Sequence, residues 1–275
     1  MPLNLDLSGS VAKVAWARNQ LDSAEGVNAR FTSKHKPYTI AVEGPDDATD
    51  GWCSIFLIGP HEIREPQFGL IVGDAVHNLR CALDYIVVAL VRASKARLSS
   101  KHQFPIFDNR DDYLRLVGSE TSANSDGMLK RVTVGLKEIW AVQPFHTKGN
   151  VITHALHCLN RFSNADKHRI LSTDMHLPGI GNASIETDGQ IIEAWDNPEL
   201  VTLGAHGYDE KFEVARRRFA KPYPKKIRLN AKISVQVLVG TPAFGKHSQG
   251  LALQPASFYD ICDVVQRIVE TFAAL

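Results

Sequence analysis

The sequence predicts an α+β protein in which helices and largely antiparallel strands occupy separate segments of the chain. Apolar residues recur at helical spacing in segments 66–91 and 255–272, whereas short β-branched and aromatic runs separated by Gly, Asn and Pro fill much of 173–254. No strand–helix–strand alternation is present, so a parallel sheet is not expected. We therefore expect one unit, residues 1–275, in which a helical block packs on the sheet.

The N-terminal part, residues 1–65, is expected to hold one helix and one β-hairpin. Segment 10–29 has apolar residues at helical spacing, and Ser10 suits the N-cap because its hydroxyl can accept from a free backbone N–H. Two short runs rich in β-branched and aromatic residues, 36–43 and 52–59, follow on either side of a stretch of turn formers. This order predicts two strands joined by a loop.

The helical block, residues 66–172, is dominated by one long helix with two different faces. It begins at Pro66, since proline fits the first helical turn, and ends near residue 94. One arc of its helical wheel is apolar and comprises Val72, Val76, Leu79, Leu83, Ile86, Val87 and Leu90. The opposite arc holds Asp74, His77, Asn78, Cys81 and Asp84. Shorter helices are expected at 111–117, 127–142 and 150–163.

The rest of the chain is expected to be a β-rich region, residues 173–254, followed by a C-terminal helix, residues 255–275. Strands are predicted at 183–187, 190–195, 200–203, 211–215 and 227–239. The final helix opens at Pro255 and carries an apolar stripe of Phe258, Ile261, Cys262, Val265, Ile268, Val269 and Phe272.

Composition excludes several classes of protein. There are 31 Lys and Arg against 30 Asp and Glu, and 44% of residues are hydrophobic, so neither a globally basic nucleic-acid coat nor a disordered chain fits. The most apolar stretch, 68–91, contains charged residues, so a membrane span is not expected. The N-terminus has no signal-peptide pattern and the four cysteines are far apart, which favours a cytoplasmic location with reduced thiols. No cofactor and no metal site are expected, because His154 and His157 have no accompanying ligand motif.

The first candidate cluster lies on the polar arc of the long helix. Asp74, His77 and Asp84 fall within roughly 80° of one another, with Arg80 about 40° further on. Such a column could orient a histidine tautomer or hold a guanidinium against a phosphate. The alternative is a buried polar network that fixes the packing of this helix, or a solvated face.

The second candidate cluster is segment 160–169, at a predicted helix boundary. His168 could act as acid or base while Arg161, Lys167 and Arg169 bind phosphate oxygens. In the alternative, Asn164 and Asp166 cap helix ends and the basic residues face solvent. From both clusters together, the residues expected to be catalytic are His168, Arg161, His77 and Asp84. Those expected to bind substrate are Arg80, Asn78, Asn164, Lys167 and Arg169.

Taken together, the two clusters carry a resemblance. The stretch 73–84, the segments Phe104-Pro105-Ile106 and Gln143-Pro144-Phe145, and the stretch 166–169 resemble a group of uncharacterised bacterial and phage-associated proteins. Arg161 followed by His168 after a helical block is also similar to the Arg-x(4–6)-His signature of the HEPN superfamily. That resemblance implies a dimeric helical bundle that cleaves RNA without a metal, with RNA and a second copy as partners. The alternative is a non-enzymatic binding or structural module whose C-terminal helix mediates dimerisation.

The distribution of charge along the β-rich region is uneven. Segment 185–210 contains seven acidic residues and no Lys or Arg, whereas 211–232 contains nine basic residues and one acid. Adjacent antiparallel strands could place these blocks opposite one another as ion pairs. The other possibility is that the run Arg216, Arg217 and Arg218 forms a strip that binds the phosphate backbone of RNA.

Overall fold

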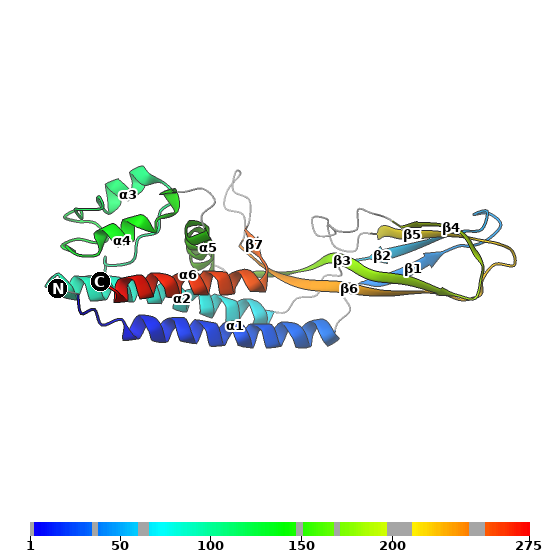
Figure 1. Ribbon diagram of the computed structural model, residues 1–275, viewed down its shortest axis with the longest axis horizontal. Helices are drawn as coiled ribbons and strands as arrows, with labels where there is room; N and C mark the ends of the chain where they lie inside the picture. Colours follow the sequence, from blue (N-terminus) through cyan, green and yellow to red (C-terminus); the bar gives the residue numbers. More distant parts are fainter. Residues whose placement is uncertain are drawn as a thin grey trace. The chain divides into compact units, whose positions relative to one another are not determined.

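Helices and antiparallel strands occupy separate stretches of the chain in the computed structural model, which confirms the α+β class (Figure 1). The structure describes residues 3–34, 38–59, 66–146, 151–167, 171–196, 211–241 and 251–275. Contacts divide the chain into two compact units, whereas the sequence led us to expect one. The helical unit contains residues 1–27, 66–172 and 239–275, and the sheet unit contains 28–65 and 173–238.

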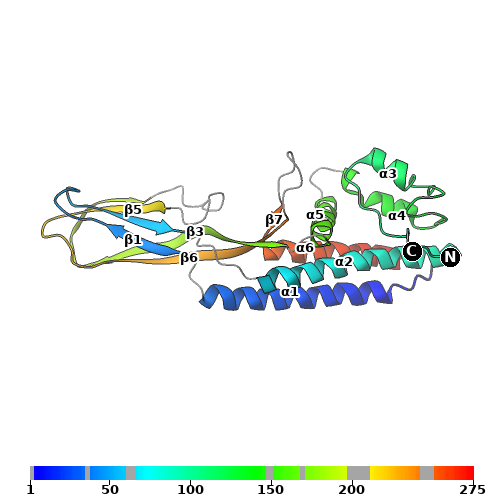
Figure 2. The same ribbon diagram turned by 180° about the vertical axis from the view of Figure 1, so that it is seen from behind.

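The helical unit is organised around the helix predicted at Pro66. Its helices are α1 (Ser8–Lys34, of which residues 8–27 belong to this unit), α2 (Pro66–Ala93), α3 (Arg110–Leu116), α4 (Leu136–Ala141), the 3₁₀ turn η1 (Pro144–His146), α5 (Val151–Asp166) and α6 (Pro255–Ala273). All seven residues of the predicted apolar arc of α2 are buried, so the two-faced helix is confirmed. Figure 2 shows α1, α2 and α6 running lengthwise, while α5 is seen nearly end-on and therefore crosses them. None of the described helices is long and apolar enough to cross a membrane.

Packing between helices explains why the unit needs both ends of the chain. Helices α2, α5 and α6 contact one another pairwise. Helix α1 is tied to α6 by the ion pair between Arg18 and Asp263 at 2.5 Å and by the Tyr259 hydroxyl, which donates to Asp22 at 2.8 Å. The apolar stripe expected on α6 is buried from Phe258 to Phe272.

Two sequence-based expectations about helices are corrected. Ser10 is not the N-cap of α1: it lies buried within the first turns, and Asp6 accepts from the backbone N–H of Ser8 at 3.1 Å instead. The helix predicted over 127–142 is present only as α4, because Gly135 at its N-cap has a φ of 73° and the chain before it forms turns. A left-handed residue interrupts the helical hydrogen-bond ladder, so apolar periodicity alone overestimated its length.

The sheet unit contains the predicted hairpin and most of the predicted β-rich region. Its strands are β1 (Thr39–Glu43), β2 (Trp52–Ile58), β3 (Ser172–Thr187), β4 (Ile191–Asp196), β5 (Lys211–Phe219) and β6 (Ile227–Gly240). The last two residues of β6 belong to the helical unit, and there they pair with the short β7 (Ala252–Leu253). One sheet has the order β1-β2-β5-β4 and the other β3-β6-β7. Segment 200–203, predicted as a strand, lies outside the described residues.

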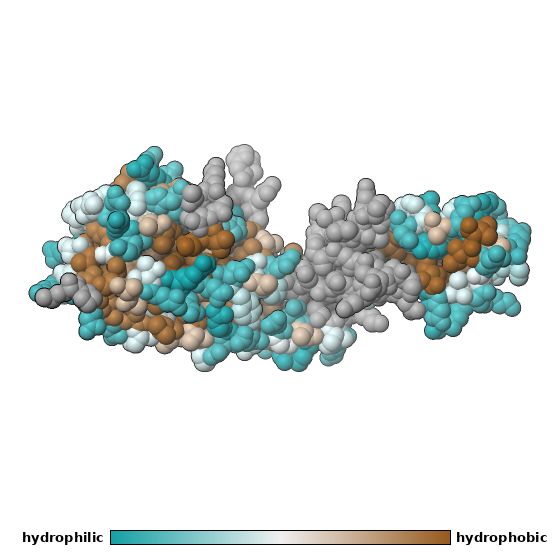
Figure 3. Space-filling model, in the orientation of Figure 1, coloured by the Kyte–Doolittle hydropathy of each residue, from teal (hydrophilic) through white to brown (hydrophobic). Residues whose placement is uncertain are grey.

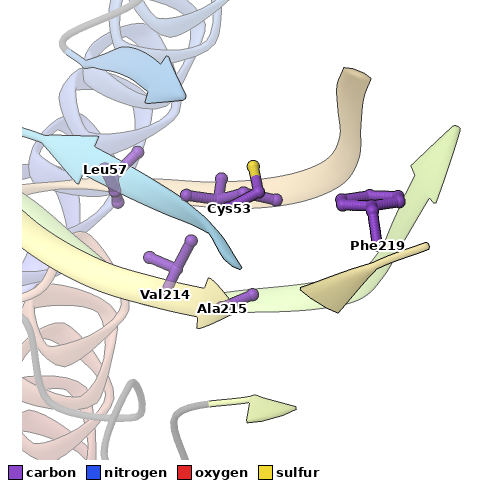
Figure 4. Close-up of a cluster of buried hydrophobic side chains, with 6 residues drawn as sticks. Cys53, Leu57, Val214, Ala215 and Phe219 are labelled. Atoms are coloured by element: carbon purple, nitrogen blue, oxygen red, sulfur yellow. The ribbon is translucent and has the colours of Figure 1, made fainter. Parts of the chain in front are cut away.

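A small apolar core holds the first sheet against its neighbours. Alternate residues of β2 are buried, and they meet β5 in a cluster of Cys53, Ile55, Leu57, Val214, Ala215 and Phe219 (Figure 4). Ile185 of β3 and Ile227 of β6 pack against this cluster, so both strands of the second sheet contribute to the same core. Burial raises the pKa of the Cys53 thiol to about 11, consistent with a packing role. The opposite face of β2 carries Trp52, Ser54 and Phe56, each only partly buried.

Candidate functional site on helix α2

The polar arc of α2 forms a stripe between two other helices of the same unit. Asp74 and His77 are exposed, and Cys81 and Asp84 are partly buried. On one side, the Lys13 ammonium of α1 donates to Asn78 Oδ1 at 2.7 Å. The C-terminal end of α5 lies on the other side. We call the three residues Asp74, His77 and Cys81 of this arc the α2 stripe.

Helix α5 reaches the stripe because residue 73 has no side chain. A β-carbon built at Gly73 would collide with the Asp166 carboxylate and would lie 3.1 Å from its Cγ. Burial raises the pKa of Asp166, and the negative charge of Asp74 raises it further, whereas the charge of His77 acts in the opposite direction. Two carboxylates from different helices therefore share the surroundings of one imidazole.

The thiol of Cys81 lies beside the same imidazole, with 3.5 Å between Cys81 Sγ and His77 Nε2. Burial raises the pKa of Cys81, while positive charge from Lys13 and Lys167 partly offsets it. Lys13 comes from α1, and Lys167 follows the last residue of α5. The site thus combines an exposed imidazole, two carboxylates and two ammonium groups. Among the residues that the structure describes, no group of three or more His, Cys, Asp or Glu side chains has a geometry that could hold a metal ion.

Two of the residues that we expected to bind substrate, Asn78 and Arg80, are buried and form hydrogen bonds within the protein. Asn78 is 7% exposed, and its amide donates to Gln20 Oε1 at 2.9 Å and to the Asp74 carbonyl at 2.8 Å. Arg80 is 8% exposed, and burial lowers its pKa. These side chains join α2 to its neighbours, which is the alternative that the polar arc left open.

Arg80 and Asp84 clamp the segment that follows α2. The Arg80 guanidinium donates to the Phe104 carbonyl at 2.5 Å, and Asp84 accepts from the Phe104 N–H at 2.8 Å. A second clamp lies beside it, because the buried Gln143 amide donates to the Pro105 carbonyl at 3.0 Å and accepts from Phe107 N–H at 3.1 Å. The segments 104–106 and 143–145, which stood out in the sequence, are therefore brought together by side chain to backbone hydrogen bonds.

The second predicted cluster is split between two sides of α5. Arg161 and Asp166 are five residues apart, which places them about 140° apart around a helix. Asp166 faces α2, whereas Asn164 is exposed and Arg161 half-buried on the outer side. His168 and Arg169 lie outside the described residues. Of this cluster, the structure brings Asp166 and Lys167 to the stripe.

Sequence reasoning missed Lys13, gave no role to Cys81 and considered Asp166 only as a cap at a helix end. The contribution of Lys13 carries no local signal, since it depends on how α1 packs against α2. A signal for Asp166 did exist, because Gly73 lies inside the long predicted helix. An interior helical glycine often marks a close approach by another element.

The basic run of β5 is paired with acidic side chains. Arg217 and Arg218 form cross-strand ion pairs with Asp196 and Glu193 of β4, at 2.6 and 3.0 Å. Arg216 pairs with Glu213 of its own strand at 2.5 Å. Each arginine of the expected nucleic-acid strip 216–218 therefore has a carboxylate partner, and the cross-strand pairing of the two charge blocks holds for Arg217 and Arg218. Of the seven acidic residues in segment 185–210, Glu199, Asp209 and Glu210 lie outside the described part.

Comparison of the chain with protein-family models, with curated proteins and with solved structures returns no match.

Proposed function

We propose that the helical unit cleaves RNA by general acid–base catalysis at the α2 stripe, with His77 as the proton-transfer residue. The observation that supports this proposal is the approach of Asp166 to Gly73, which brings a second carboxylate to the surroundings of His77. This approach of α5 to α2 brings together parts of the two clusters that the sequence indicated separately.

The proposed chemistry uses groups that are close together in the stripe. The ribose 2′-oxygen attacks the adjacent phosphorus while a base removes its proton; the bond from phosphorus to the 5′-oxygen breaks, and an acid protonates that oxygen. An imidazole suits this work because its ordinary titration range lies near neutral pH. The negative charge of Asp166 favours the protonated imidazole, and Lys13 and Lys167 supply positive charge for the phosphate.

The HEPN-like assignment of Arg161 and His168 is modified in this proposal. Arg161 lies on the outer side of α5, away from Asp166, so we do not assign it to the same site as His77. His168 follows Lys167 directly in the sequence, and we propose it as the second proton-transfer group. Asp166, whose pKa burial raises, is the other candidate for the acid.

The test uses the full chain, a labelled single-stranded RNA and a chelator that suppresses contaminating metal-dependent nucleases. His77→Gln is compared with His154→Gln. His154 is a matched control because it is also exposed and also lies four residues before a cysteine, with its Nε2 3.6 Å from Cys158 Sγ. We expect His77→Gln to lower the cleavage rate about 100-fold or more, and His154→Gln to leave it unchanged.

A DNA of the same sequence should remain intact, since it lacks the 2′-hydroxyl. Wild-type protein that cuts no RNA, or a His77→Gln variant that cuts at the normal rate, would contradict the proposal. The second candidate, a non-enzymatic helical module, would then be favoured. It already has one observation in its support, because Asn78, Arg80 and Asp84 hold neighbouring segments by hydrogen bonds.

A further inference from the structure

The sheet unit has a pocket on the face opposite its apolar core. The pocket has a volume of about 450 Å³ and is lined by Trp52 and Ser54 of β2, Trp195 of β4 and Arg216 of β5. Strand pairing explains this set, because Ser54 and Trp195 are the partners of Arg216 on its two sides, and Trp52 pairs with Arg218, two residues further along. Figure 3 shows exposed apolar residues among hydrophilic ones on the sheet unit, and Trp195 is 42% exposed.

Tryptophans two strands apart define the width of this pocket. Neighbouring strands are about 4.8 Å apart, so side chains on β2 and β4 arise roughly 10 Å from each other, with β5 between them. In the register Arg216 separates Trp195 from Ser54, and Trp52 is two residues from Ser54 on β2. One exposed indole, Trp195, and one partly buried indole, Trp52, with polar groups nearby, form a concave surface for a ligand with flat apolar faces.

The charges around the pocket are already matched within the chain. Arg216 donates through Nε and Nη2 to both oxygens of Glu213, at 2.5 and 2.6 Å. Arg218 is paired with Glu193 and Asp50. Together with the pair between Lys211 and Glu43, the ion pairs of this face join three cations to four carboxylates. A polyanion such as RNA would find no excess of positive charge here.

A cationic ligand is disfavoured by the cations that the protein itself places beside the two indoles. The guanidinium carbon of Arg216 lies 5.7 Å from the centre of the Trp195 ring, and that of Arg218 lies 6.0 Å from the Trp52 ring. Each indole therefore already has a cation close to it, and a second positive charge would be repelled. The remaining class is a neutral ligand.

We propose that the pocket formed by Trp52, Ser54, Trp195 and Arg216 binds a neutral carbohydrate chain. A sugar ring presents an apolar face of C–H groups that can pack on an indole, and its hydroxyls both donate and accept hydrogen bonds. Arg216 is a donor, Glu213 an acceptor and Ser54 both, and the three are adjacent in the register. A proline-rich peptide would use the donors alone, because its prolines have no backbone N–H to give to Glu213.

The test measures binding of neutral oligosaccharides to the full-length chain by isothermal titration calorimetry. The probes are cellohexaose, xylohexaose, mannohexaose, maltohexaose and chitohexaose, with a 12-nucleotide oligouridylate and decaproline in parallel. We expect at least one hexasaccharide to bind with a Kd below about 1 mM, which corresponds to roughly −4 kcal/mol. Trp52→Ala and Trp195→Ala should each weaken that binding at least tenfold.

Two controls separate loss of the pocket from loss of the fold. Trp16→Ala removes another exposed tryptophan, 57% exposed on α1, and should leave binding unchanged. Ser54→Met fills the pocket without removing either indole and should also weaken binding at least tenfold. The idea is overturned if no hexasaccharide binds, if the tryptophan and Ser54 variants bind like the wild type, or if oligouridylate or decaproline binds in their place. RNA cleavage by the helical unit is measured separately, so either proposal can fail alone.

Discussion

Replacement of Gly73 by alanine provides a sharp test of the contact between α2 and α5. In most helix interiors this change stabilises a protein by about 1 kcal/mol, because alanine has the higher helix propensity. At Gly73 the three atoms nearest to the new β-carbon all belong to the Asp166 carboxylate, with Cγ at 3.1 Å. Crowding of this kind costs about 1–3 kcal/mol. We therefore expect Gly73→Ala alone to be neutral or to destabilise the protein by up to about 2 kcal/mol.

The matched experiment repeats the change in an Asp166→Ala background. Without the carboxylate the new methyl group meets no obstacle, so Gly73→Ala should then stabilise by the ordinary ~1 kcal/mol. The coupling energy between the two positions should be about 1–3 kcal/mol. Urea unfolding followed by circular dichroism at 222 nm gives the four free energies, since that signal reports on the helices. If Gly73→Ala stabilises equally in both backgrounds, with a coupling below about 0.5 kcal/mol, the contact that we describe is not present in solution.

Other predictions concern single buried groups, and thermal unfolding monitors each of them. Arg80→Met should destabilise by about 2–3 kcal/mol, because it removes the donor that holds the Phe104 carbonyl and the cation beside the partly exposed Asp84; an unchanged Tm would refute the clamp. Gln143→Leu should destabilise by about 2–4 kcal/mol, since it leaves buried backbone groups without their partners. Gln143→Glu keeps the acceptor for Phe107 N–H but not the donor, so it should destabilise by only part of that amount. Tyr113→Phe should be neutral or stabilising by up to about 1 kcal/mol, because the buried hydroxyl has no hydrogen-bond partner among the described residues; a clear loss of stability would reveal one. Asp166→Asn should raise Tm at pH 7 by about 1–2 °C. Burial raises the folded-state pKa of Asp166, so its ionised form destabilises the folded protein above that pKa. The gain in Tm from Asp166→Asn should therefore vanish as the pH falls through this pKa. A gain in Tm that grows in acid would contradict the prediction.

The elements that could be predicted from the sequence are those whose pattern repeats locally. The opposite faces of α2 follow from the spacing of its own residues, as does the buried stripe of α6. The β1–β2 hairpin was marked by its turn formers. The helix expected over 127–142 was too long because the positive φ of Gly135 is a backbone state that residue type permits without requiring.

The opposing charge blocks show what can be read from the sequence and what only the structure decides. Seven acidic residues followed by nine basic ones are visible in the sequence and pose the question of pairing. Only the antiparallel register of β4 and β5 answers it for Arg217 and Arg218, by setting Asp196 and Glu193 within reach. Register depends on hydrogen bonds between strands that are distant in sequence, so composition cannot specify it.

The candidate site was likewise determined partly by the sequence and partly by the tertiary structure. By itself the sequence determined which residues share a face of α2, because helical periodicity is a property of consecutive residues, and that a second polar cluster lies at the end of α5. The tertiary structure alone decided that Asp166 and Lys167 meet that face while Arg161 does not, and that Lys13 closes it from α1. The distance between two helices is set by how their side chains pack, and here it is set by the missing side chain of Gly73.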